Sequence, residues 1–163
     1  MLVALTNSSP DLQKLVAFEN AFDRVFSIID AEGSLTHGGV VVQDCLSLLA
    51  NLLRFNASNQ SFFRETSGVT KLAAILGHVI REEESEDGVP DWASSQRDKN
   101  LWGLLSVIRL FLLGGSAGTQ VNQAAFWQNG VASQILDIGF HASMATSIRA
   151  EVSSEALNYE PPI

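Results

Sequence analysis

The sequence predicts an all-α protein: an armadillo-like solenoid in which about three helical repeats of roughly 47 residues stack into a right-handed superhelix. Three observations lead to this fold class. One phrase of the sequence recurs, its apolar residues fall at the helical spacing of three and four, and the composition is typical of a folded domain. With 46% hydrophobic residues, 17% charged residues and four prolines, the chain has enough apolar side chains to build a core.

The recurring phrase marks the units of the solenoid. Residues 59–76 read NQSFFRETSGVTKLAAIL, and residues 122–139 read NQAAFWQNGVASQILDIG. A fainter copy lies 47 positions before the first, where Gln13 matches Gln60 and the apolar positions stay apolar. One such unit cannot cover its own apolar stripe, so neighbouring copies must stack to form a continuous core.

The spacing of the copies sets the expected boundaries. The second and third copies are 63 residues apart instead of 47, and the 16-residue difference falls in an acidic stretch that holds Gly88 and Pro90. A charged run with Gly and Pro interrupts helical periodicity, so we expect an inserted loop there. The predicted division is a single domain with units at 1–36, 37–81 and 101–140, an acidic insertion at 82–100 and an incomplete last unit at 141–163.

Both ends of the chain predict a fragment of a longer superhelix. Residues 2–5 match only the second half of a first helix, and no further NQ phrase follows the third copy. Such a fragment would leave apolar surface uncovered at its ends. We therefore expect this chain to be only marginally stable by itself.

Within the second unit, the pattern predicts a long helix, a short helix and another long helix. Residues 40–54 carry one apolar stripe at spacings of three and four. Asn59 is the expected N-cap of the short helix, Gly68 marks its end, and the third helix follows. A small residue recurs at this junction, at Ala21 and one place off register at Gly130, and suits a tight turn between packed helices.

The first helix of the third unit, residues 101–113, is apolar on nearly all sides. Such a helix must be covered on both sides, here by the acidic insertion or by the neighbouring unit that is missing from this sequence. The apolar stretch 101–115 is too short to span a bilayer and holds Arg109 in its middle. We expect no transmembrane segment.

Charge and cysteine usage narrow the function classes. A net charge of -8 argues against nucleic-acid binding, which needs clustered Lys and Arg to neutralise phosphates. Cys45 is the only cysteine, so no internal disulfide can form. A lone cysteine fits a reduced, cytosolic setting. Its place on the apolar stripe predicts a buried, inert thiol.

The residues do not assemble an enzyme or metal site. His37, His78 and His141 each stand without Cys, Asp or Glu at metal-ligand spacing. GGVVV at 38–42 and GGSAG at 114–118 lack the spacing of phosphate-binding loops and are predicted to be turns. We expect neither catalysis nor a bound metal or cofactor.

The best candidate for a binding surface is a polar row on the first helix of the second unit. The row consists of Asp44, Ser47, Asn51 and Arg54. Spaced three and four apart, these residues lie opposite the apolar stripe and form a ridge that receives a partner protein, or else simply the solvent-exposed side of an amphipathic helix. The run EEESED at 82–87 either docks a basic partner or is a solvated acidic loop.

Two long segments resemble the armadillo-like head region of the general vesicular transport factors, the Uso1-type tethers that act between the endoplasmic reticulum and the Golgi. They are LQKLVAFENAFDR at 12–24 and VVVQDCLSLLANLLRFNASNQSFF at 40–63. The likeness weakens through NLWGLLSVIRLFLL and QVNQAAFWQNGV and reaches about Gly139. The coiled coil and acidic tail of the family have no counterpart in this sequence, so coiled-coil dimerisation is not expected of it.

The resemblance implies a non-enzymatic docking module in transport from the endoplasmic reticulum to the Golgi and within the Golgi. The implied partners are proteins: Rab-type GTPases, SNAREs, golgins or other tethers. The implied location is the cytoplasm, with indirect, peripheral association with Golgi and vesicle membranes. The alternative is an armadillo scaffold of the nuclear-import or adhesion type, which would carry regular ladders of Asn and Trp residues along its groove. Asn51 has no counterpart at Ala4 or Gly114, which counts against that alternative.

Overall fold

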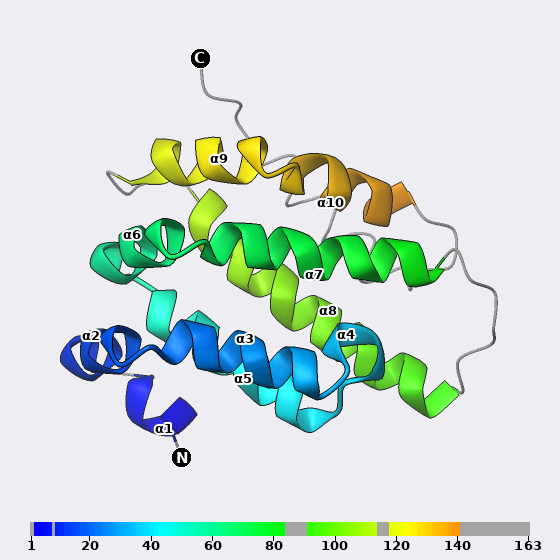
Figure 1. Cartoon of the computed structure of the whole chain (residues 1–163), viewed down its shortest axis with the longest axis horizontal. Helices are drawn as coiled ribbons and strands as arrows, with labels where there is room; N and C mark the ends of the chain where they lie inside the picture. Colours follow the sequence, from blue (N-terminus) through cyan, green and yellow to red (C-terminus); the bar gives the residue numbers. More distant parts are fainter. Residues whose placement is uncertain (1, 8, 84–90, 114–117, 141–163) are drawn as a thin grey trace.

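The computed structural model describes residues 2–7, 9–83, 91–113 and 118–140, and these form ten α-helices (Figure 1). The helices are α1 (Leu2–Thr6), α2 (Pro10–Phe18), α3 (Ala21–Ala31), α4 (Ser34–His37), α5 (Val40–Leu53), α6 (Ala57–Glu65), α7 (Gly68–Glu83), α8 (Asp91–Leu112), α9 (Thr119–Gln128) and α10 (Val131–Phe140). The predicted all-α, armadillo-like class is confirmed. No helix among these residues is long and apolar enough to cross a bilayer.

The helices fall into three units that follow the predicted order of first, second and third helix. The units are α1 to α3, α5 to α7 and α8 to α10, with the short α4 between the first two. In Figure 1 the second and third helices form three parallel rows at the front, and α5 and α8 lie behind them. Helix α5 packs on α3 and α8, so the first helices form the inner layer of the stack.

The turn between the second and third helices is the same in every unit. Asn20, Ser67 and Gly130 occupy equivalent positions and have φ angles of 63°, 62° and 74°. Gly130, which the sequence pattern placed one position off register, is therefore in register. The tight turn lies one residue before the predicted Ala21 and Gly68, which are instead the first residues of α3 and α7.

Gly68 has a different reason for lacking a side chain. A Cβ atom at this position would lie 2.6 Å from the ring of Phe63, which is closer than van der Waals contact allows. The glycine lets α7 begin directly against the aromatic core.

The predicted N-cap of the short helix is wrong by three residues. Asn56 caps α6, because its side-chain oxygen accepts a hydrogen bond from the Asn59 backbone N–H at 3.2 Å. Asn59 lies inside the helix, is completely buried, and donates from Nδ2 to the Leu52 carbonyl at 2.8 Å. Two asparagines near a helix start cannot be ranked by spacing alone, and tertiary burial decides between them.

The acidic insertion needs a similar correction. Helix α8 begins at Asp91, so residues 91–100 are the first turns of a helix and not a loop. Asn100 fixes these turns, because its buried Nδ2 donates to the carbonyls of Leu35 at 3.2 Å and Gly38 at 2.8 Å. Residues 84–90, most of the EEESED run, and the expected last unit at 141–163 lie outside the described residues.

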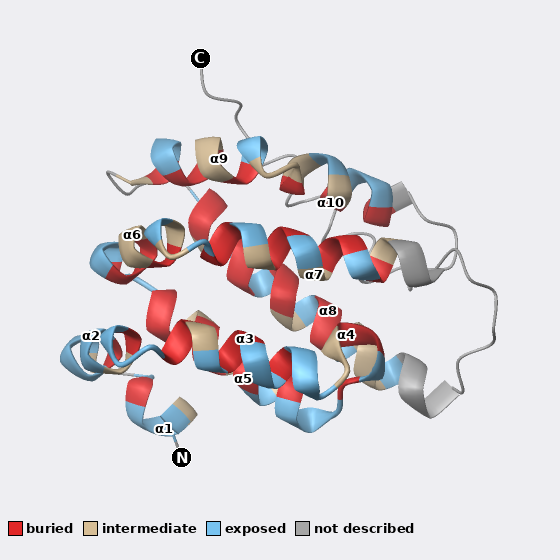
Figure 2. Cartoon of the chain, in the orientation of Figure 1, coloured by how far each residue is buried: buried red, intermediate tan, exposed pale blue. Residues whose placement is uncertain are grey.

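The core is continuous across all three units, as Figure 2 shows by the buried residues along the facing sides of the helices. A line of aromatic rings crosses it, with centroids 5.0 Å apart from Phe22 to Phe63, 5.4 Å from Phe63 to Phe111, and 5.1 Å from Phe111 to Phe126. Edge and tilted ring contacts of this kind are favourable beyond their buried area.

The recurring Gln of the phrase caps the C-terminal end of the first helix in each unit. The Nε2 atoms of Gln13, Gln60 and Gln123 donate to the carbonyls of Thr6, Leu53 and Leu112 at 2.9, 3.0 and 3.4 Å. These carbonyls at a helix end have no partner within the helix, so a buried amide satisfies them. The glutamine recurs because each unit needs the same cap.

The apolar helix of the third unit is covered without help from a further unit. Helix α8 packs on α4, α5 and α9. Its exposed described residues form one stripe at spacings of three and four: Ser95, Lys99, Trp102, Ser106 and Arg109. The predicted cover was the insertion or a missing further unit; the cover that the structure shows is α5, α4 and α9.

Candidate functional site

The predicted ridge lies on α5, a first helix, and the structure divides its members. Asp44 and Arg54 are exposed. Ser47 is half-buried and donates from Oγ to the Gln43 carbonyl at 2.9 Å. Asn51 is 8% exposed and donates from Nδ2 to the Val3 carbonyl at 2.8 Å, which ties α5 to α1. Asn51 therefore has a structural role, and the exposed part of the ridge consists chiefly of Asp44 and Arg54.

The surroundings of the ridge form a broad polar groove of about 720 Å³ between α1, α5 and α8. Helix α8 contributes Lys99, Trp102 and Ser106 to it. Trp102 is 42% exposed, so an aromatic face lies beside the ridge. Lys99 falls in the stretch predicted to be a loop, and Trp102 and Ser106 fall on a helix predicted to be covered on nearly all sides, so none of them was predicted beside the ridge.

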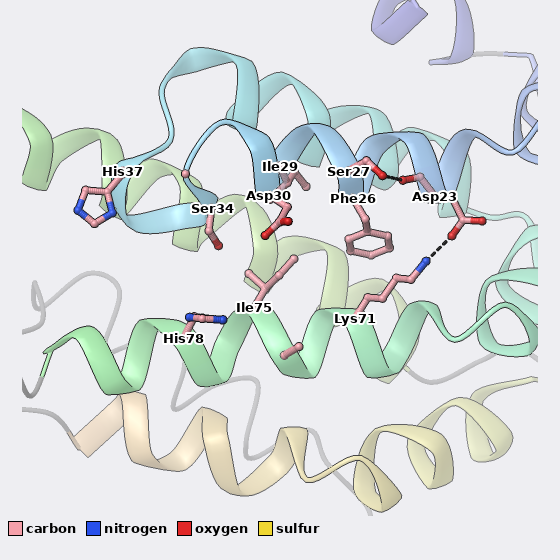
Figure 3. A pocket seen from close by; sticks show the side chains of 12 residues that line it. Asp23, Phe26, Ser27, Ile29, Asp30, Ser34, His37, Lys71, Ile75 and His78 are labelled. Carbon is pink, nitrogen blue, oxygen red and sulfur yellow. Dashed lines mark hydrogen bonds and ion pairs between the residues drawn. The ribbon is translucent and has the colours of Figure 1, made fainter.

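A second groove, on the side of the third helices, was not predicted. It measures about 700 Å³ and lies between α3 with α4 on one wall and α7 on the other (Figure 3). Its lining combines an apolar floor with charged and polar rims. The residues are Asp23, Phe26, Ser27, Ile29, Asp30, Gly33, Ser34, His37, Lys71, Ala74, Ile75 and His78.

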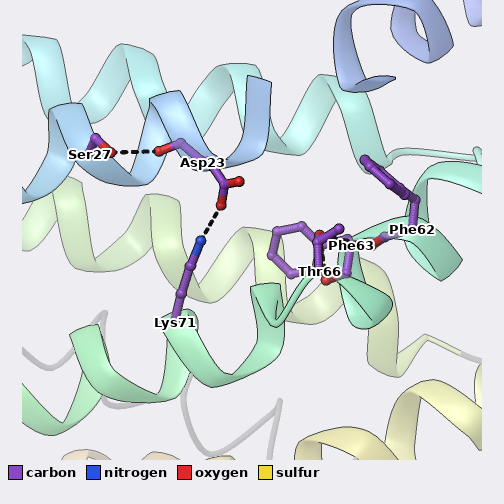
Figure 4. A network of polar contacts seen from close by, with 6 residues as sticks. All are labelled: Asp23, Ser27, Phe62, Phe63, Thr66 and Lys71. Carbon is purple, nitrogen blue, oxygen red and sulfur yellow. Dashed lines mark hydrogen bonds and ion pairs between the residues drawn. The ribbon is translucent and has the colours of Figure 1, made fainter. Parts of the chain in front are cut away.

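One end of this groove is bridged by an ion pair between Lys71 of α7 and Asp23 of α3 (Figures 3 and 4). The Lys71 Nζ also lies 5.6 Å from the centroid of the Phe26 ring, a distance suited to a cation–π contact. Ser27 donates from Oγ to the Asp23 carbonyl at 2.9 Å on the same helix. Figure 4 shows that the bridge lies near the end of α7 that follows Phe62, Phe63 and Thr66.

The other end of the groove is polar and open. Asp30, His37 and His78 are exposed there, and Ser34 is half-buried. The two histidines, which are far apart in the sequence, thus line one groove from different elements. They do not form a metal site, since the described residues hold no group of three metal-ligating side chains. His141 lies outside the described residues.

Cys45 is buried on α5, as predicted. Burial raises the pKa of its thiol above 9.0, and the negative charges of Asp44 and Glu32 raise it further. The thiol therefore stays protonated at neutral pH and is a poor nucleophile.

Known proteins resemble this chain along nearly all of its length. It is 40% identical over 158 residues to the intracellular protein transport protein USO1 of Saccharomyces cerevisiae, which is 97% of this chain and 8% of that protein. It is also 40% identical over 157 residues to the general vesicular transport factor p115 of Rattus norvegicus, which is 95% of this chain and 15% of that protein. The chain thus spans a small part of the length of these relatives. No protein-family model matches it.

The likeness extends to the fold. A crystal structure of Uso1 superposes with a TM-score of 0.86 at 40% sequence identity, covering 97% of this chain and 24% of that one. A plant protein, golgin candidate 6 of Arabidopsis thaliana, is 40% identical over 114 residues, which is 70% of this chain and 12% of that protein.

Proposed function

The chain belongs to the family of Uso1-type vesicular transport factors, and we propose that it serves as a docking module of a vesicle tether in transport from the endoplasmic reticulum to the Golgi and within the Golgi. The observation that supports this function is the likeness in both sequence and fold along nearly the whole chain. It favours this function over a nuclear-import or adhesion scaffold, because the matched relatives are named for vesicular and intracellular protein transport.

The module acts by presenting surfaces and not by chemistry. Its stacked units share one continuous core, so the grooves beside α5 and between α3 and α7 keep a fixed geometry relative to each other. A rigid scaffold loses little conformational freedom on binding, which favours affinity. The family resemblance suggests Rab-type GTPases, SNAREs, golgins or other tethers as partners, and a peripheral place on Golgi and vesicle membranes.

The ridge on α5 remains a candidate partner surface within this proposal. Asp44 and Arg54 are accessible, and the neighbouring Trp102 offers the kind of amphipathic aromatic surface that is enriched at protein interfaces. A matched pair of variants, Asp44→Arg and Asp30→Arg, compares this groove with the groove between α3 and α7 at equal change in charge.

The test is a chimera in the full-length relative. The matching segment of yeast USO1 is replaced by this chain, and docking of vesicles from the endoplasmic reticulum to Golgi membranes is measured beside growth of yeast that depends on the chimera. Docking near the level of the natural protein is expected. A chimera that folds, as judged by circular dichroism, but neither docks vesicles nor supports growth would contradict the proposal.

A further inference from the structure

The groove between α3 and α7 pairs acidic positions on one wall with basic positions on the other. Asp23 and Asp30 lie seven residues apart on α3, and Lys71 and His78 lie seven apart on α7. A spacing of seven residues keeps each pair on one side of its helix, about 10 Å apart along the axis. The two helices run in the same direction (Figure 1), so each acidic position has a basic position across from it.

The first of these two positions already holds a cation. The ammonium group of Lys71 pairs with the Asp23 carboxylate and lies over the Phe26 ring. A carboxylate beside an aromatic face is a favourable environment for a Lys or Arg side chain. The Lys71 ammonium group is thus an example, within the chain itself, of a cation held against this side of α3.

The second position lacks its cation. Asp30 is exposed, and no described residue pairs with its carboxylate. Its counterpart is His78, which forms no ion pair with Asp30. His37 and Ser34 are the other polar neighbours in the groove, and neither pairs with the Asp30 carboxylate. Figure 3 shows Asp30 directed into the groove from α3, with Ile75 beneath it and His78 further along α7, on the side of Ser34.

Between the two positions the floor is apolar. Phe26 and Ile29 are 8% and 1% exposed, and Ile75 is half-buried on the opposite wall. Ala74, on the same wall, is a small residue and leaves room at the rim. An occupant of this groove therefore meets apolar surface first and an unpaired carboxylate about two helical turns from the Lys71 bridge.

From this arrangement we infer that the groove binds a short segment of a partner protein that places a Lys or Arg side chain against Asp30 and an apolar side chain over Phe26 and Ile75. The inference rests on the proposed docking function and names the chemistry of the partner. The groove volume of about 700 Å³ suits a few residues of peptide. The net charge of -8 attracts a basic segment and disfavours approach to an anionic membrane surface.

The test selects peptides without assuming a partner. A phage library of random twelve-residue peptides is enriched on the whole chain, and the enriched peptides are synthesised with fluorescein for anisotropy titrations. Enriched sequences are expected to carry Lys or Arg beside an aliphatic or aromatic residue. Their affinity should fall with rising salt, because the contact includes an ion pair at the rim of the groove.

Variants of the groove give the decisive comparison. Asp30→Asn removes the carboxylate, and His78→Lys provides an internal cation at the position that Lys71 occupies two turns earlier; each is expected to weaken peptide binding about tenfold. His78→Gln changes the same side chain without adding a charge and should weaken binding less than His78→Lys. Asp44→Asn is the matched control, because it makes the same change in net charge as Asp30→Asn in the other groove.

Three outcomes would overturn the inference. Enriched peptides without a basic residue, an absence of enrichment, or equal affinity for the parent and the His78→Lys variant would each contradict it. Self-association of the chain that disappears in the His78→Lys variant would identify a second copy as the occupant instead. The chimera measures vesicle docking without reference to peptide charge, so normal docking beside a failed peptide test rejects this inference and leaves the docking function standing.

Discussion

The two junctions between third helices in this molecule differ, although the same repeat makes both. Helix α10 packs along α7, and Thr70 donates from Oγ1 to Asn129 Oδ1 at 2.9 Å while Gln134 Nε2 donates to the Ala73 carbonyl at 3.1 Å. Helix α3 approaches α7 less closely, and the ion pair between Asp23 and Lys71 bridges a groove between them.

The difference comes from one short element. Helix α4 lies between the first and second units and packs on both α7 and α8, and the chain has no described helix of this kind after α7. Helix α4 contacts both α3 and α7 and lines one end of the groove between them. A small departure from regularity thus accompanies a groove in this repeat protein.

The largest effect is expected from the residue that lies beneath both junctions. Phe63 is completely buried, and its ring contacts Phe22 and Phe26 of the first unit and Phe111 of the third. Phe63→Ala should lower the free energy of unfolding by about 3–5 kcal/mol through lost burial and a cavity. Urea denaturation followed by circular dichroism measures this. Phe55→Ala is the control, because Phe55 is 99% exposed and should change little; a loss below about 1 kcal/mol for Phe63→Ala would contradict a shared core.

A smaller effect is expected where α4 is fixed to α8. Asn100→Ala removes both hydrogen bonds to the carbonyls of Leu35 and Gly38 and leaves two buried acceptors unsatisfied. The expected loss is about 1–3 kcal/mol, with faster hydrogen exchange in α4 than in α10. Ser106→Ala removes only a bond to the Trp102 carbonyl on the same helix and serves as the control. Equal exchange in α4 of parent and variant would show that Asn100 does not hold α4.

The smallest effect belongs to the ion pair itself. Both side chains are more than a third exposed, so a double-mutant cycle of Asp23→Asn and Lys71→Met should give a coupling of only about 0.2–1 kcal/mol. This coupling should shrink in high salt. At the junction between α7 and α10, Thr70→Val removes the hydrogen bond from Thr70 to Asn129. This bond joins uncharged groups, so its contribution to stability should show no such salt dependence. A salt-independent coupling between Asp23 and Lys71 would mean that their contact between α3 and α7 is not electrostatic.

The sequence predicts the helical fold class well and the details of the helix junctions poorly, for a physical reason. The recurrence of Gln13, Gln60 and Gln123 reflects a cap that every unit needs, so it appears in the sequence pattern. The N-cap at Asn56 and the left-handed turn at Ser67 differ from the prediction by a few residues, because several polar residues near a helix end compete for the same role.

The groove between α3 and α7 depends on packing between residues far apart in the chain. Asp23 and Asp30 on one helix, and Lys71 and His78 on the other, show a matching spacing of seven in the sequence. That spacing is the one signal that could have pointed to the groove, but only once α3 and α7 are known to be neighbours. Asn51 illustrates the opposite error, because its buried bond to Val3 depends on α1 covering that face of α5.

The central claim is that the groove between α3 and α7 is the surface that binds a partner protein. Site-specific photocrosslinking tests this claim most directly. In the yeast USO1 chimera, a photoreactive phenylalanine analogue replaces one of three exposed residues. These are Ala74 in the groove between α3 and α7, Ser133 on α10 beside the junction with α7, and Asp44 on the ridge of α5. During vesicle docking, the account predicts a crosslink to a vesicle or Golgi protein from position 74 that is lost in the His78→Lys variant. Crosslinks from positions 44 or 133 alone would contradict it.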